Sequence, residues 1–224
     1  PTLEPLLTLL LDTPQFFVMF WNSTGQSVAQ VAGNLLVGAP AAWAISRLRF
    51  RGRSMVRGLY IVLMLLPFQV TMVPSYLVLR QFGLLDTPWA IILPGIFSTF
   101  PVFIMERGFD TIPREVLESA SIDGANQWQR FWRIGIPLGI PGLISALTLG
   151  FLDAWNAIEQ PMTFLESPQY WPLSLFFTDP ANLDTKQLGL AMAASLWMLL
   201  PSILVFRFGQ TYLEAGLTKG AVKG

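Results

Sequence analysis

Long stretches without a charged residue dominate this chain of 224 residues. Thirty-four uncharged residues separate Asp12 from Arg47, and four later stretches of at least 19 residues lie at 58–79, 87–105, 134–152 and 187–206. An α-helix rises about 1.5 Å per residue, so about 20 residues cross a hydrocarbon layer about 30 Å thick. The pattern predicts an all-α membrane protein, a polytopic bundle with five transmembrane helices in this chain.

The first uncharged stretch is too long for a single crossing. Its opening residues 14–21 are rich in aromatic side chains, and the polar residues 22–25 follow. Aromatic residues concentrate at membrane surfaces. We therefore expect residues 14–21 to lie on the surface and residues 23–46 to span the membrane.

The composition agrees with a membrane protein, since 53% of the residues are hydrophobic and only 12% are charged, about half the charged share of a soluble domain. Fourteen basic and fourteen acidic residues leave no net charge, so nothing indicates nucleic-acid binding. The sequence has no Cys and no His, which excludes disulfides, thiolate or imidazole metal sites and histidine-dependent catalysis. We predict no catalytic residue and no metal ligand.

Arginine and lysine positions predict the orientation of the helices. The connection after the first helix contains five arginines and no acid, at Arg47, Arg49, Arg51, Arg53 and Arg57. Placing this connection in the cytoplasm puts twelve basic residues inside, leaves Arg80 and Lys186 outside, and makes the C-terminus cytoplasmic. A basic cluster beside a membrane also contacts anionic lipid headgroups.

The same topology puts the N-terminal end outside, although residues 1–11 carry no basic residue that would mark a cleavable signal. We therefore expect a sixth helix upstream of Pro1.

Prolines interrupt the predicted helices at eight positions, namely Pro67, Pro74, Pro88, Pro94, Pro101, Pro137, Pro141 and Pro201. An interior proline removes a backbone donor and kinks the helix, and in lipid the freed carbonyl must find a partner within the protein or in a water-filled cavity. Kinked bundles favour a conduit, although proline is also simply common in membrane helices. Gly135 and Gly139 form a G-x-x-x-G pair that permits close helix contact.

Few polar side chains lie at membrane depth, and none is a full charge at a helix centre, which argues against a proton relay or a voltage sensor. Amides and hydroxyls suit a neutral polyhydroxy solute, although they also bind helices to each other. The candidates for the solute path, at or beside the helices, are Asn34, Gln69, Thr71, Asp153, Trp155 and Asn156.

Two connections are long enough to have their own structure. The external loop 153–186 is rich in proline and aromatic residues, so we expect it to lie on the membrane surface or to dock a partner. In the cytoplasmic loop 106–133, Thr111 is predicted to cap a short helix that ends at Gly124, and a second amphipathic stretch follows at 126–133. Such a loop either fits into a partner or covers the ends of its own bundle.

This cytoplasmic loop carries a recognisable signature. Glu118-Ser119-Ala120, Gly124 three residues later, and Ile134-x-Ile136-Pro137 after nine more resemble the E-A-A-x3-G-x9-I-x-L-P motif of binding-protein-dependent ABC importer permeases. Only Ser119 and Ile136 depart from it. The surrounding sequence is similar to the carbohydrate branch of the family, and the resemblance covers nearly the whole chain.

The resemblance implies one transmembrane permease domain over residues 1–224 with the type I ABC importer permease fold, in the inner (cytoplasmic) membrane of a prokaryote. Its partners would be a second homologous permease, two ATPase subunits that bind ATP and Mg, an extracytoplasmic solute-binding protein and membrane lipid. The residues implied to couple to the ATPases are Glu118, Ser119, Ala120, Asp123, Gly124, Ile134 and Pro137. The C-terminal tail, with Lys219, Gly220 and Lys223, would reach between the ATPases.

The chain itself has no G-x-x-x-x-G-K-[ST] loop, so we expect no cofactor in it and ATP hydrolysis only in its partners. The solute implied by this branch is a sugar or a related polyhydroxy compound, with a polyol or glycerol phosphate as alternatives. A secondary transporter or a membrane scaffold is also conceivable, but the sequence has neither internal repeats nor ionisable groups at mid-membrane.

Overall fold

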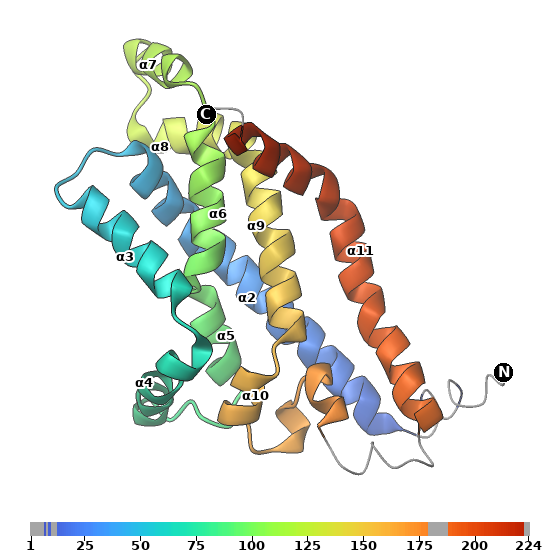
Figure 1. Ribbon diagram of the computed structural model, residues 1–224. Coiled ribbons are helices and arrows are strands. Elements are labelled where there is room, and N and C mark those ends of the chain that lie inside the picture. The colour runs from blue at the N-terminus through green and yellow to red at the C-terminus, as the bar shows by residue number, and fades with distance from the viewer. Residues whose placement is uncertain (1–6, 8, 10–12, 179–187, 222–224) are drawn as a thin grey trace. The chain divides into compact units, whose positions relative to one another are not determined.

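The computed structural model describes residues 7, 9, 13–178 and 188–221, and within these ranges it contains helices and no strand (Figure 1). The all-α prediction is confirmed. The α-helices are α2 (Pro14–Arg47), α3 (Arg53–Leu65), α4 (Phe68–Gln81), α5 (Trp89–Ile96), α6 (Thr99–Asp110), α7 (Arg114–Ile122), α8 (Gln127–Arg130), α9 (Ile136–Asn156), α10 (Glu159–Phe164) and α11 (Leu188–Ala221). A π-helix, η1 (Phe131–Gly135), and two 3-10 helices, η2 (Pro168–Tyr170) and η3 (Leu173–Phe177), complete the described elements.

Four helical stretches of the described chain are long and apolar enough to cross a membrane, namely Pro14–Arg47, Trp89–Asp110, Gln127–Asn156 and Gly189–Glu214. The helices α3 and α4 reach that length only together, because the chain breaks at Leu66 and Pro67. Four of the five predicted spans therefore have matching helical stretches, and the second corresponds to this pair, whose two halves are bent by 103°.

The start of α2 differs from the sequence-based expectation. Residues 14–21 are its first turns and not a separate surface segment. Phe16 and Met19, three positions apart on one helix face, are buried in a cluster with Leu173 and Phe176. Burial of this face explains why the helix extends to Pro14.

The chain divides into two compact units. The first comprises residues 1–30, 67–95 and 151–207, and the second comprises residues 31–66, 96–150 and 208–224. Helices α2, α9 and α11 contribute residues to both. The prediction of a single domain over residues 1–224 stays a prediction.

In the first unit, α4 packs beside α10, and the loop predicted to be external folds onto the start of α2 (Figure 1). The Nδ2 atom of Asn22 donates to the carbonyl of Gln169 at 2.7 Å, and Nε2 of Gln26 donates to the carbonyl of Tyr170 at 2.9 Å. Phe164 and Phe176 of this loop are buried. Its described part, up to Thr178, therefore packs against its own chain, whereas residues 179–186 lie outside the described residues.

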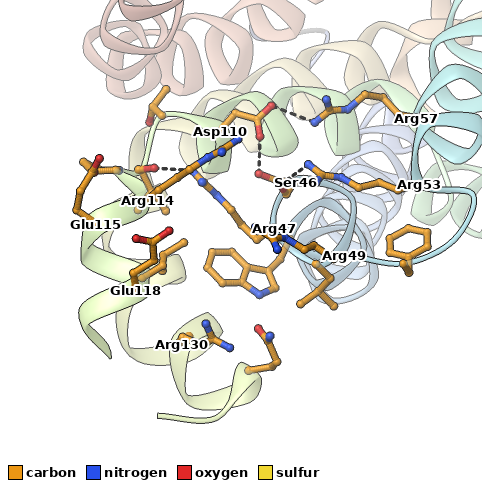
Figure 2. A pocket seen from close by; sticks show the side chains of 18 residues that line it. Ser46, Arg47, Arg49, Arg53, Arg57, Asp110, Arg114, Glu115, Glu118 and Arg130 are labelled. Atoms are coloured by element: carbon orange, nitrogen blue, oxygen red, sulfur yellow. Dashed lines mark hydrogen bonds and ion pairs between the residues drawn. The ribbon is translucent and has the colours of Figure 1, made fainter. Parts of the chain in front are cut away.

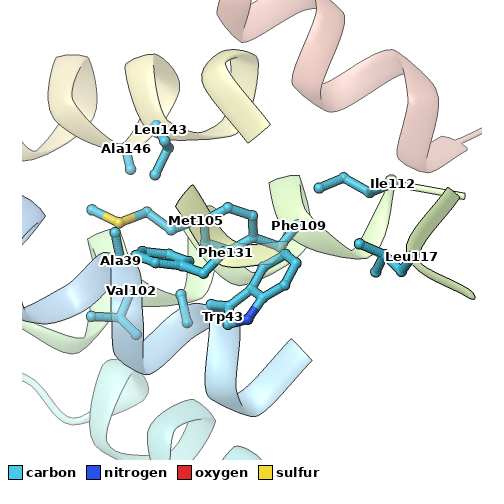
Figure 3. Packing of buried hydrophobic residues seen from close by; sticks show 11 residues of the cluster. Ala39, Trp43, Val102, Met105, Phe109, Ile112, Leu117, Phe131, Leu143 and Ala146 are labelled. Atoms are coloured by element: carbon cyan, nitrogen blue, oxygen red, sulfur yellow. The ribbon is translucent and has the colours of Figure 1, made fainter. Parts of the chain in front are cut away.

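The second unit is built around an aromatic cluster (Figure 3). The ring centroid of Trp43 lies 5.3 Å from that of Phe109 and 5.8 Å from that of Phe131, in edge-on and tilted arrangements. Such geometries stabilise aromatic pairs beyond simple area burial. The cluster joins the end of α2 to α6, η1 and α9.

Helices α6 and α9 approach most closely at two glycines. A Cβ atom added to Gly108 would lie 2.6 Å from the Cα atom of Gly142, so only glycine fits on either side. The predicted pair Gly135 and Gly139 instead lies against the rings of Trp43 and Phe109. The close contact therefore exists, but its backbone-to-backbone part uses glycines that the G-x-x-x-G pattern does not include.

The break between α5 and α6, ahead of Pro101, is closed by a side chain of α2. The Nδ2 atom of Asn34, which is buried, donates to the carbonyls of Ile96 at 2.9 Å and of Ser98 at 3.1 Å. Asn34 thus satisfies carbonyls on both sides of Phe97, whose own carbonyl is the one that Pro101 frees.

Candidate functional site

The segment predicted to form the cytoplasmic loop 106–133 is a projecting helix on a folded base. Helix α6 continues to Asp110, so the connection begins at Thr111. The predicted cap is wrong, because Thr111 Oγ1 donates to the carbonyl of Gly108 at 2.8 Å, in the last turn of α6. The N-cap position of α7 is occupied by Pro113, whose ring fixes φ, and Thr111 lies two residues too early to reach α7.

Helix α7 presents almost all of its surface outward. Its single buried residue is Leu117, which packs into the aromatic cluster of the second unit (Figure 3). Glu118 and Ser119 are exposed, and Ala120 is half-buried. The helix ends, as predicted, at Gly124, whose φ of 82° is a left-handed conformation that glycine adopts readily.

The base of α7 is fixed by the elements that follow it. Asn126 and Gln129 form a reciprocal capping box at the start of α8. Arg130 donates to the hydroxyl of Ser121, which connects α8 to α7. Phe131 is buried in the core, and the neighbouring Trp132 is exposed. Helix α7 is therefore held at its C-terminal end as well as by Leu117.

The signature residues do not form one cluster. Five of them lie on α7 or at its end, namely Glu118, Ser119, Ala120, Asp123 and Gly124. Ile134, in η1, packs against the core, and Pro137 is exposed in the first turn of α9. The π-helix ends at Gly135, two residues before Pro137, and the amide of Ile136 donates to the carbonyl of Phe131, five residues earlier. The wide turn accommodates the proline ring, which crowds the carbonyl four positions before it.

A pocket of about 1070 Å³ lies between α7 and the arginine-rich connection (Figure 2). Two of its arginines hold helix ends. Arg53 Nε donates to the carbonyl of Ile45 at 2.6 Å, near the end of α2. Arg47 donates to the carbonyl of Phe109 in the last turn of α6, which also accepts the amide of Ile112, and to the carbonyl of Ile112 just beyond the helix. The positive charge of both arginines complements the helix dipole.

A third arginine joins α3 to α6. Arg57 forms ion pairs with the buried Glu106 and with Asp110, the latter at 3.1 Å. Asp110 also accepts from the hydroxyl of Ser46 at 2.6 Å (Figure 2). The prediction from the sequence for these arginines was membrane orientation and lipid contact only. The signal it missed is Glu106, an acid that directly follows a long uncharged stretch and needs a partner when buried.

The candidates for the solute path divide between the two units. Asn34 belongs to the second unit, whereas Gln69, Thr71, Asp153, Trp155 and Asn156 belong to the first. Trp155 is buried, and its Nε1 donates to the carbonyl of Met198 at 3.0 Å. Asn34 and Trp155 thus each donate to backbone carbonyls of their own unit, and their role in solute passage stays a prediction.

The other candidates are closer to the surface. Gln69 is exposed, and its Nε2 donates to both carboxylate oxygens of Glu159 at 2.8 Å. Thr71 and Asn156 donate to carbonyls of their own helices, and Asp153 is exposed. The role of these residues in solute passage stays a prediction.

The candidates in the C-terminal tail are described only in part. Lys219 and Gly220 lie in the last turn of α11, without described side chains, and Lys223 lies outside the described residues.

A known family matches most of this structure. Residues 34–219, which include all the elements around the pocket, match the family described as binding-protein-dependent transport system inner membrane component. The chain belongs to this family. The resemblance inferred from the signature is thereby confirmed, and the chain is an inner membrane component of a transport system.

Individual members of the family are similar over nearly the whole chain. It is 33% identical over 211 residues to the inner membrane ABC transporter permease protein YcjP of Escherichia coli (strain K12), covering 93% of this chain and 75% of that protein. It is 31% identical over 218 residues to the diacetylchitobiose uptake system permease protein DasC of Streptomyces coelicolor, covering 95% of this chain and 78% of that protein.

A solved structure of the family has the same fold. It is the crystal structure of a bacterial ABC transporter involved in the import of the acidic polysaccharide alginate, with a TM-score of 0.80 and 26% identity, covering 93% of this chain and 78% of the matched chain. The chain therefore has the fold of an ABC importer permease.

Proposed function

We propose that this chain is the translocation subunit of an ATP-driven importer for a carbohydrate, and that α7 couples it to a cytoplasmic ATPase. Support for the substrate class comes from the similar proteins, since DasC is named for diacetylchitobiose uptake and the solved transporter for alginate import. The described solute-path candidates are mainly amides and hydroxyls, which suit a polyhydroxy solute.

The observation that carries the coupling proposal is the way α7 is mounted. Its exposed side, with Glu118 and Ser119, is free to enter a cleft of a partner, while Leu117 and Ser121 fix it to the core and to α8. The half-buried Ala120 and the exposed Gly124 are small, so a partner can approach closely. A helix held in this way transmits a displacement to α6 and α9 rather than absorbing it.

The proposed assembly contains a second related permease, two ATPase subunits that bind ATP and Mg, and an extracytoplasmic solute-binding protein. Closure of the ATPases would move α7 of each permease, and the helices would then open the solute path alternately to either side. This mechanism places α7, the arginine-rich connection and the C-terminal tail in the cytoplasm, and it assigns ATP hydrolysis to the partner subunits.

The coupling proposal predicts that Glu118→Lys uncouples the transporter without unfolding the chain. An exposed charge change usually alters stability by no more than about 0.5 kcal/mol, whereas a like-charge contact across an interface costs several kcal/mol. ATPase co-purification and solute uptake should therefore fall together while membrane insertion persists. Glu166→Lys is the matched control, since it makes the same charge change at an exposed residue of the first unit.

Gly124 provides an independent test of the same proposal. Gly124→Val should also uncouple, because a branched side chain is strained at φ 82°. Gly124→Asn is the control, because asparagine tolerates the left-handed conformation. Parental uptake with attached ATPases in both Glu118→Lys and Gly124→Val would show that α7 only covers the end of its own bundle.

A further inference from the structure

The pocket between α7 and the arginine-rich connection opens where two candidate membrane spans end. The span of α2 ends at Arg47 and the span that includes α6 ends at Asp110, and both residues line the pocket. The pocket therefore lies beside the ends of two stretches that are long and apolar enough to span a membrane.

The charges that line the pocket are unbalanced. Six arginines and three acids contribute to its wall, and Asp110 already pairs with Arg57 and Ser46. The two remaining acids, Glu115 and Glu118, lie on α7. Figure 2 shows the arginine side chains on several sides of the pocket.

Three of the six arginines retain donors for a ligand. Arg47, Arg53 and Arg57 are engaged with helix-end carbonyls and acids, as described above. By contrast, Arg49 and Arg114 are exposed and make no hydrogen bond or ion pair with any described residue. The Nε atom of Arg130 is buried and has no hydrogen-bond partner in the described chain.

We propose that this pocket binds a phosphate group, and that an anionic membrane lipid supplies it. A guanidinium presents paired N–H donors that match phosphate oxygens, and several arginines around one cavity neutralise the charge of the anion. Clusters of arginine beside spanning helices attract anionic headgroups. With α7 on one wall and the end of α2 on the other, a bound phosphate would hold the base of α7 to the membrane surface.

The test uses the chain purified with the subunits that co-purify with it. Short-chain phosphatidylglycerol, phosphatidylcholine or inorganic phosphate is titrated against it, the shift in melting temperature is followed, and native mass spectrometry counts the lipid retained. Phosphatidylglycerol should raise the melting temperature, and R49Q/R114Q should lower the affinity for phosphatidylglycerol about tenfold. R51Q/R133Q is the matched control, because it removes the same charge from exposed residues that do not line the pocket. The control should bind within about twofold of the parent.

Three outcomes would overturn the proposal. Equal weakening in both double variants would indicate a general surface charge effect. If inorganic phosphate alone produced the full shift in melting temperature and phosphatidylglycerol added nothing to it, the lipid would be excluded as the source of the bound phosphate group. Loss of ATPase subunits in R49Q/R114Q at unchanged lipid affinity would show that the pocket receives an acidic group of a protein instead. Solute uptake is not measured, so the result is independent of the coupling proposal.

Discussion

Asp86 shows how much a single residue holds in the first unit. It lies between α4 and α5 with φ 54°, the single positive value among the non-glycine residues described. Its Oδ1 accepts the amides of Glu166 at 2.9 Å and Ser167 at 2.7 Å, and its Oδ2 accepts the hydroxyl of Ser167. These hydrogen bonds hold the pKa of the Asp86 carboxyl below its ordinary value, and the bond from the Ser167 hydroxyl has the largest effect.

The lowered pKa of Asp86 predicts a pH-dependent stability of the first unit. Because the folded chain holds the carboxylate more strongly than the unfolded chain does, the stabilisation is complete above the unfolded pKa and is lost as the pH falls through the folded value. Asp86→Asn should reduce the fall of the melting temperature with acidification. Asparagine tolerates the left-handed backbone, and its oxygen can still accept the two amides while its NH2 group donates to the Ser167 hydroxyl, so the change removes the charge and reverses one hydrogen bond. An unchanged pH profile in Asp86→Asn would contradict this assignment.

Asn34 illustrates what single residues reveal in a sequence and what they do not. Asn34 is one of the few polar side chains expected at membrane depth, and the sequence allowed either contact with the solute or a role in binding helices to each other. Which one applies depends on where α5 breaks, because the carbonyls of Ile96 and Ser98 are free to accept only if the helix is interrupted there. That interruption is a tertiary feature.

At the scale of elements, the crossing of α6 and α9 leaves no room for an added side-chain atom. Gly142→Ala places a methyl group against the backbone of Gly108, where no side chain can rotate away. We expect a loss of at least about 1–3 kcal/mol, the usual cost of overpacking, measured as a lower melting temperature of the purified chain.

Gly58→Ala is the control for this helix crossing. Gly58 lies within α3 with open space around its Cα atom, so alanine should be neutral or stabilising there because of its higher helix propensity. A tolerated Gly142→Ala would show that α6 and α9 are farther apart than described.

The local chemistry of the elements was only partly predictable. The end of α7 at Gly124 follows from a property of glycine that holds in any context. The role of Thr111 could not be predicted in this way, because its hydroxyl lies near two helix ends. It bonds to α6, which extends to Asp110. The arginines show the same limit, since Arg47 and Arg53 act on carbonyls whose positions only the folded chain defines.

For the molecule as a whole, we expect α4 to contribute Gln69 and Thr71 to the solute path. Cysteines placed at Gln69 and Thr71 should label differently when solute and nucleotide are added to the assembled transporter. The chain has no native cysteine, so the background is low. Leu204→Cys, at an exposed position of α11, reports labelling that does not depend on transport. If positions 69 and 71 respond no more than position 204, the path lies elsewhere.

The membrane spans and the projecting α7 were predictable because hydropathy and one compact motif specify them locally. The break at Pro67 was expected as a kink, but not as a division into two helices. The two compact units were not foreseen either, since each is assembled from three separate parts of the chain. Such long-range organisation depends on contacts that no local pattern records.

The arginines after α2 connect the making of this protein with its final form. Positive charge in a connection between spanning helices generally biases the direction of insertion, and in the folded chain Arg47 and Arg53 also serve as the caps of two helices. The insertion machinery reads only the sum of positive charge, whereas capping depends on the forked shape of the guanidinium. Lysine at these two positions would therefore keep the charge that insertion requires but lose the paired donors that cap the helices. The chain would be correctly oriented, with loose helix ends, and would be a target for cellular quality control.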